Sequence, residues 1–63
     1  MKRKYLEIHK EKEIVGRYEI TGLDTDQVFD QVKPILAPKQ EVIEVVTHRQ
    51  LPQIELSKEF EIN

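Results

Sequence analysis

The stretch LDTDQVFDQVKPIL, residues 23–36, decides the fold because it reads as the helix of the chain. Asp24 stands at the position of an N-cap, where its carboxylate can accept hydrogen bonds from the free N–H groups of the first turn. Apolar side chains then recur at i, i+4, i+7 and i+8, with Phe29 beside them. They form one amphipathic stripe of Val28, Val32, Ile35 and Leu36.

The predicted end of this helix is set by two prolines. Pro34 has no N–H to donate and its ring crowds the preceding turn, which costs about 3 kcal/mol inside a helix. Pro38 disfavours helical geometry at the residue before it. We therefore expect a helix from Thr25 to about Lys33, followed by a bent turn through Leu36.

Two strands are predicted before the helix. Residues 4–9 and 14–21 alternate between apolar and polar side chains, which is typical of half-buried strands. The charged residues 10–13 between them predict a polar hairpin tip. Gly16 interrupts the second strand and indicates a bulge or a close backbone approach. Within that strand, the alternation places three apolar side chains on one face: Ile14, Tyr18 and Ile20.

Two further strands are predicted after the helix. Residues 41–47 direct apolar side chains to both faces, which favours a central strand or one whose second face is covered by a partner subunit. Residues 54–62 alternate over a long span, with Lys58 on the otherwise apolar face. A charge there suggests a bulge, or an edge strand protected by an inward charge.

The predicted order is β-β-α-β-β in one small domain, residues 1–63. We expect an α+β fold, with a three- to four-stranded, mostly antiparallel sheet and one helix packed on one face. The apolar stripe of the helix is narrow, so the helix should cover only part of that sheet.

Composition limits the function classes. The net charge is −2, and the chain has no cysteine and no apolar stretch of membrane-spanning length. We expect a cytoplasmic protein without membrane contact. A chain this short buries only about 60% of its unfolded surface, which favours association into a homodimer as a source of added stability.

No catalytic constellation, metal-ligand motif or nucleotide-binding loop is present in the sequence. His9 and His48 could approach each other if the first and third strands were neighbours, but we interpret them as surface residues. Asp24 and Asp26 are explained by helix capping and by the helix dipole. We therefore expect no enzymatic activity and no cofactor.

The function that best fits these features is a non-catalytic protein-interaction module. It would bind another protein, or a second copy of itself, through exposed sheet surface or an edge strand. The candidate contact residues lie on the last two predicted strands: Val42, Val46, Glu55, Glu59 and Glu61.

The alternative function is nucleic-acid binding by a basic N-terminal hairpin. A basic hairpin with exposed aromatic residues can follow phosphates and stack on bases. The candidate contacts are Lys2, Arg3, Lys4 and Arg17. Glutamates interleaved among these cations weaken the positive potential, which makes this the second choice.

Overall fold

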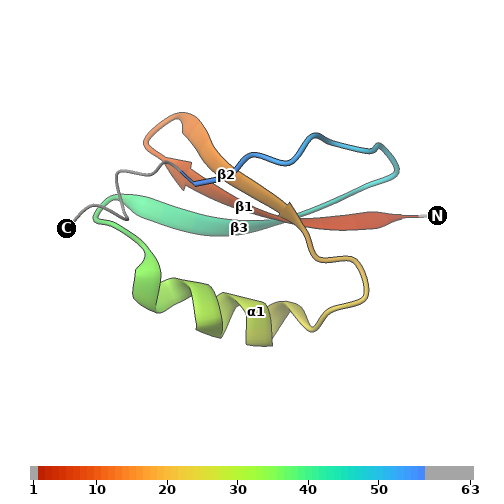
Figure 1. Cartoon of the computed structure of the whole chain (residues 1–63), viewed down its shortest axis with the longest axis horizontal. Coiled ribbons are helices and arrows are strands. Elements are labelled where there is room, and N and C mark those ends of the chain that lie inside the picture. The colour runs from red at the N-terminus through yellow and green to blue at the C-terminus, as the bar shows by residue number, and fades with distance from the viewer. Residues whose placement is uncertain (1, 57–63) are drawn as a thin grey trace.

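The structure is a computed structural model that describes residues 2–56, in which one helix and three strands form two layers. The three strands form one antiparallel sheet in the order β2-β1-β3, and α1 lies along one face of it (Figure 1). The elements are β1 (Arg3–Lys10), β2 (Glu13–Glu19), α1 (Thr25–Val32), a 3-10 turn η1 (Lys33–Ile35) and β3 (Gln40–Thr47). The predicted α+β class with an antiparallel sheet is therefore confirmed.

The predicted fourth strand is not confirmed. In the described part of the chain, the segment after β3 makes only an isolated antiparallel bridge between Ile54 and Arg17 of β2. The two residues exchange backbone hydrogen bonds of 2.7 and 3.0 Å. The rest of the predicted strand, including Lys58, lies outside the described residues.

The central strand is β1, so the first alternative for residues 41–47, a central strand, is wrong, and coverage of their second face by a partner subunit stays a prediction. β1 pairs with β2 on one side and β3 on the other, and its middle residues Tyr5 to Ile8 are all buried. β3 has apolar residues on both faces but is only partly covered on each, and Ile43 and Val46 remain 40% and 52% exposed. An apolar pattern on two faces thus did not require a neighbour on both edges.

The hairpin between β1 and β2 is tighter than its sequence indicated. Lys10 pairs with Glu13, so the loop consists of Glu11 and Lys12, and Glu11 adopts a positive φ of 58°. The pairing shifts between Ile8 and His9, as at a β-bulge, which confirms the irregularity predicted near Gly16.

The register shift changes the face of one predicted core residue. Tyr18 pairs with Leu6 on the face that meets the helix, but Ile14 pairs with His9, which lies on the opposite face. Each extra residue in a strand reverses the side on which the following side chains point. The prediction that Ile14 and Tyr18 share a face is therefore wrong.

The helix begins and ends as predicted. The Asp24 side chain accepts hydrogen bonds from the backbone N–H groups of Asp26 at 3.0 Å and Gln27 at 3.3 Å. The α-helix ends at Val32, and Pro34 lies in the 3-10 turn that follows.

The core forms between the helix and the sheet around Leu6, Ile8 and Ile20. Three of the four residues of the predicted helical stripe pack against this cluster: Val28, Val32 and Leu36. Phe29 also packs against it. Ile35 does not, and it is 62% exposed. The tighter winding of the 3-10 turn changes the angle between successive side chains and turns Ile35 away from the sheet.

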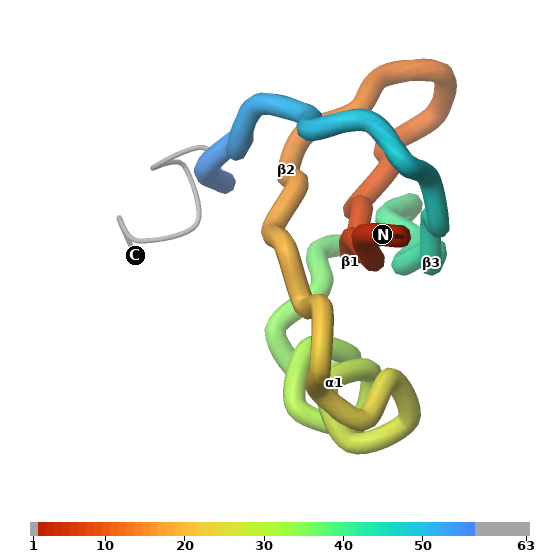
Figure 2. Tube along the Cα trace, turned by 90° about the vertical axis from the view of Figure 1, so that its right-hand side faces the viewer, coloured from red at the N-terminus to blue at the C-terminus, as the bar shows by residue number. Residues whose placement is uncertain are grey.

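Residues 48–56, which we call the strap, cross the second face of the sheet and continue around the outer side of β2, where Leu56 packs against the core. The strap leaves the end of β3, passes over the face opposite α1 and reaches the outer side of β2 (Figure 2). We call the two sides of the sheet the helix face and the strap face. No helix within residues 2–56 is long and apolar enough to cross a membrane.

Candidate interaction surface

The strap is held by the phenol groups of two tyrosines. The hydroxyl of Tyr5 accepts a hydrogen bond from the N–H of Leu51 at 2.9 Å and donates to the carbonyl of Arg49 at 3.2 Å. The hydroxyl of Tyr18 accepts from the N–H of Leu56 at 2.9 Å. These contacts satisfy backbone groups of a segment that has only one ladder bridge of its own.

A buried charge network lies on the strap face. Glu7 is only 6% exposed, and its carboxylate accepts a hydrogen bond from Nε of Arg17 at 2.9 Å. Nε2 of His9 lies 2.8 Å from the other carboxylate oxygen. Arg17 also donates to the carbonyl of Pro52 at 3.2 Å, so the network connects β1, β2 and the strap.

The balance of two effects sets the pKa of Glu7. Burial by itself raises the pKa of this carboxyl group, because it removes the charged form from water. Hydrogen bonds from His9 and Arg17, together with their positive charge, act in the opposite direction and outweigh burial. The pKa of Glu7 therefore lies below its usual value.

The network has a structural role, because it connects β1, β2 and the strap. All members have partners, and Arg17, the cation that could meet an anionic ligand, is mostly buried and paired with Glu7. A buried ion pair of this kind fixes the arrangement of the surrounding elements, since a single unpaired partner would be costly.

The outer edge of β3 is the unpaired edge of the sheet in the part of the chain that the structure describes. Within residues 2–56 no strand pairs with this side of β3, whereas the outer side of β2 bonds to Ile54. Ile43 on the strap face and Val46 on the helix face are both exposed large hydrophobic side chains. An edge strand with exposed apolar side chains presents backbone groups and contact area to a partner strand.

The structure brings together only some of the predicted protein-contact residues. Val42 and Val46 lie on the helix face of β3, where Val42 is partly buried in the core and Val46 is exposed. Glu55 is exposed but follows Ile54 at the opposite edge of the sheet. Glu59 and Glu61 lie outside the described residues.

Most of the predicted nucleic-acid contacts have partners within the fold. Arg3 forms an ion pair with Glu19 at 3.2 Å, and Nζ of Lys4 donates to the carbonyl of Leu23 at 2.8 Å. Arg17 belongs to the buried network, and Lys2 is exposed next to the first strand. These cations therefore do not form one free basic patch.

The two histidines lie far apart. β1 and β3 are neighbours, but His9 pairs with Glu41 at one end and Arg3 pairs with Thr47 at the other. His48 directly follows Thr47, so about six strand residues, roughly 20 Å, separate it from His9. Neighbouring strands thus do not make a histidine pair here.

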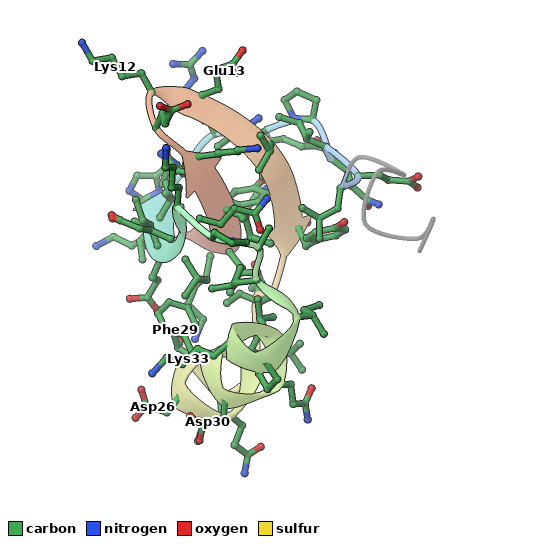
Figure 3. The ribbon with its side chains drawn as sticks, turned by 90° about the vertical axis from the view of Figure 1, so that its left-hand side faces the viewer. Lys12, Glu13, Asp26, Phe29, Asp30 and Lys33 are labelled. Carbon is green, nitrogen blue, oxygen red and sulfur yellow. The ribbon has the colours of Figure 1, made fainter. Side chains whose placement is uncertain are left out.

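The acidic side chains of the helix point away from the sheet. Asp26 and Asp30 lie on the outer side of α1, whereas Phe29 lies toward the sheet (Figure 3). Figure 3 also places Lys12 and Glu13 at the hairpin tip, on the side of the molecule opposite the helix. No group of three or more metal-ligating side chains occurs in the described part of the chain.

Sequence reasoning did not identify the tethers of the strap. Tyr5 and Arg17, which bond to residues 49–54, are far from them in sequence. The available signal was that both occupy polar-face positions of alternating strands, where a buried polar side chain needs a partner. The identity of that partner depended on the path of the strap.

Comparison of the chain with family models, curated proteins and solved structures gives no match.

Proposed function

We propose that this chain is a small, non-catalytic interaction module that binds another protein, or a second copy of itself, along the outer edge of β3. The observation that supports this proposal is the asymmetry of the two sheet edges. The chain covers the outer side of β2 with its own strap, and no described residue pairs with the outer side of β3.

The chemistry of β3 suits strand addition. Its backbone supplies hydrogen bonds to an added strand, and exposed Ile43 and Val46 offer apolar contact on both faces. A sheet edge is also a known liability for uncontrolled pairing, and natural proteins place charges there to limit it. Glu41 and Glu44 occupy such positions in β3.

The proposal includes the cytoplasm as the compartment, because a chain without cysteine forms no disulfides and needs no oxidising compartment. Nucleic-acid binding remains the alternative. It has less support, because Arg3, Lys4 and Arg17 each have a partner within the fold.

A backbone-specific substitution tests the edge. Glu44→Pro removes one N–H from the middle of β3, and Glu44→Ala is the matched control that removes the side chain but keeps the N–H. Random peptides displayed on phage are selected against the wild-type chain, and self-association is followed by analytical ultracentrifugation. We expect binding or self-association to be lost in Glu44→Pro and retained in Glu44→Ala.

As a control, circular dichroism is used to check that both variants are folded. The proposal is wrong if the folded wild-type chain neither self-associates nor selects any peptide. It is also wrong if every interaction found survives Glu44→Pro.

A further inference from the structure

We propose that the occupant of the β3 edge is an extended segment of another protein with two cationic side chains three residues apart and two apolar residues between them. This inference rests on the proposed function and specifies the chemistry of the partner. It follows from the direction of the backbone groups of β3 and from the positions of its two glutamates.

The direction of the backbone groups follows from the bridge at the other edge. Arg17 exchanges both of its backbone hydrogen bonds with Ile54, so its N–H and C=O point away from β1. Successive residues of a strand direct these groups to opposite edges. The groups of Tyr18 therefore point toward β1, and its partner Leu6 directs its own groups back toward β2.

The same alternation continues across β1 to β3. Leu6 lies opposite Glu44, but its backbone groups face β2, so the pair does not exchange hydrogen bonds. The N–H and C=O of Glu44 therefore face outward, and so do those of Val42 and Val46. These three residues form an available ladder for one added strand.

The two glutamates of β3 lie on opposite faces of this ladder. Glu44 lies on the helix face, where Oγ1 of Thr25 donates to its carboxylate at 2.7 Å, and Glu41 lies on the strap face. None of the ion pairs among the described residues includes either one. The two residues between them, Val42 and Ile43, are apolar.

An added strand must match this pattern across both faces. Side chains directly opposite each other in an antiparallel pair lie about 4.5–5.5 Å apart, close enough for opposite charges to attract. A spacing of three places two side chains on opposite faces of a strand, whereas a spacing of two places them on the same face. Cations at i and i+3 therefore meet Glu44 and Glu41, and cations at i and i+2 cannot meet both.

A second copy of β3 fits this edge poorly. β3 contains two glutamates and no lysine or arginine, so pairing it with itself brings four carboxylates to one interface. In the register that centres the shared ladder, Glu44 lies directly opposite Glu44 of the second copy. Like charges directly opposite each other destabilise strand pairing, and a cationic segment removes that repulsion.

The test is an NMR titration of the full chain at low salt with three blocked seven-residue peptides. The basic peptide is Lys-Val-Ile-Lys-Val-Val-Thr, and the acidic peptide Glu-Val-Ile-Glu-Val-Val-Thr is the chain's own 41–47 sequence. The third peptide, Lys-Val-Lys-Ile-Val-Val-Thr, has the composition of the basic one but places its lysines two apart. In the antiparallel register that pairs both lysines with Glu44 and Glu41, the readout is the backbone amide shift of the two outward-facing residues that the peptide covers, Val42 and Glu44.

We expect the basic peptide to shift these two amides and to bind about tenfold more tightly than the acidic peptide, with the third peptide in between. Added salt should weaken the binding, because exposed charge pairs are screened. The folded variant Glu41→Lys/Glu44→Lys should reverse the preference and select the acidic peptide.

The inference is overturned if the basic and acidic peptides bind equally, or if the two lysine spacings make no difference. Preference for the acidic peptide, with self-association that Glu44→Pro abolishes, contradicts the inference but supports the proposed edge function. If no peptide shifts the amides of β3 and Glu44→Pro changes no interaction, the inference and the proposed function both fail.

Discussion

At the residue scale, Glu7 is the buried carboxylate of the strap face. Its carboxylate contacts both Arg17 of β2 and His9, which lies two residues further along β1. Its pKa lies below the usual value of 4.5 because of those partners. The unfolded chain therefore binds more protons than the folded chain between the two pKa values, and stability depends on pH there.

Glu7→Gln should lower the free energy of unfolding by about 1–3 kcal/mol at neutral pH, because Arg17 loses its buried charged partner. The stabilisation that Glu7 gives the wild type is fully present above pH 4.5 and is lost as the pH falls through its lower folded pKa. The difference in the free energy of unfolding between wild type and variant should therefore become smaller at acidic pH. Urea unfolding at several pH values measures this difference.

The control for this prediction is Glu55→Gln, which removes an exposed carboxylate that belongs to no ion pair among the described residues. It should change stability little at any pH. A Glu7→Gln effect that stays constant from neutral to acidic pH would contradict the role assigned to the Glu7 charge.

Residues whose chemistry is local were predictable. Asp24 caps the helix because it needs only the N–H groups two and three positions ahead. Glu7 was not predictable as a buried residue, because its partner Arg17 is ten residues away across a hairpin with a bulge. Its burial also depends on the strap.

At the scale of elements, Gly16 allows Leu56 of the strap to pack closely against β2. A Cβ at this position would lie 3.1 Å from Cδ2 and 3.3 Å from Cγ of Leu56. Leu56 packs against the core from the strap, so the missing side chain of Gly16 makes room for it. The sequence marked Gly16 as an irregular position, and only the path of the strap showed which residue fills the space.

Gly16→Ala should therefore destabilise the protein by about 1–2 kcal/mol, because the new methyl group displaces Leu56. The same substitution in a Leu56→Ala background should cost much less, because the neighbour that it meets is gone. Denaturant unfolding of the four proteins gives the coupling energy between the two sites. Equal costs in both backgrounds would show that the methyl group meets an obstacle other than Leu56.

The sequence of β3 alone does not specify its place in the sheet. Its alternating apolar residues suit a central strand as well as an edge strand with two partly covered faces. β1 is central because it pairs with both other strands, although its own sequence resembles a half-buried strand with Glu7 and His9 on the polar face. The strap covers that face and makes its burial possible.

At the scale of the whole molecule, the sheet lies between α1 and the strap (Figure 2). The strap is tethered at separate points by Tyr5 and Tyr18, each through its hydroxyl group. Local opening of such a segment should require less free energy than global unfolding, because few regular backbone bonds hold it.

Tyr5→Phe should open the strap near Leu51 while the sheet remains folded. The substitution removes the acceptor of the Leu51 N–H and the donor to the Arg49 carbonyl, and a hydrogen bond of this kind contributes about 1 kcal/mol. Hydrogen exchange of the Leu51 amide should become several-fold faster, with β1 and β3 amides little changed.

Tyr18→Phe is the matched control, because its hydroxyl accepts from Leu56 instead. It should accelerate exchange at Leu56 and leave Leu51 as in the wild type. An identical exchange pattern in the two variants would mean that the strap opens as one unit and not at separate tethers.

The sequence by itself determined the features that depend on neighbours along the chain. These are the capped helix, its end shortly before Pro34, the three strand segments and the irregularity at Gly16. Local backbone chemistry and the periodicity of apolar side chains are sufficient for them.

The tertiary structure alone decided the order of the strands, the burial of Glu7 and the exposure of Ile43 and Val46. It also decided that the strap pairs with the outer side of β2, whereas no described residue pairs with the outer side of β3. The physical reason is that periodicity specifies which side of a strand is apolar, but not what packs against it. That depends on contacts between residues far apart in sequence, and the proposed binding edge is one result of them.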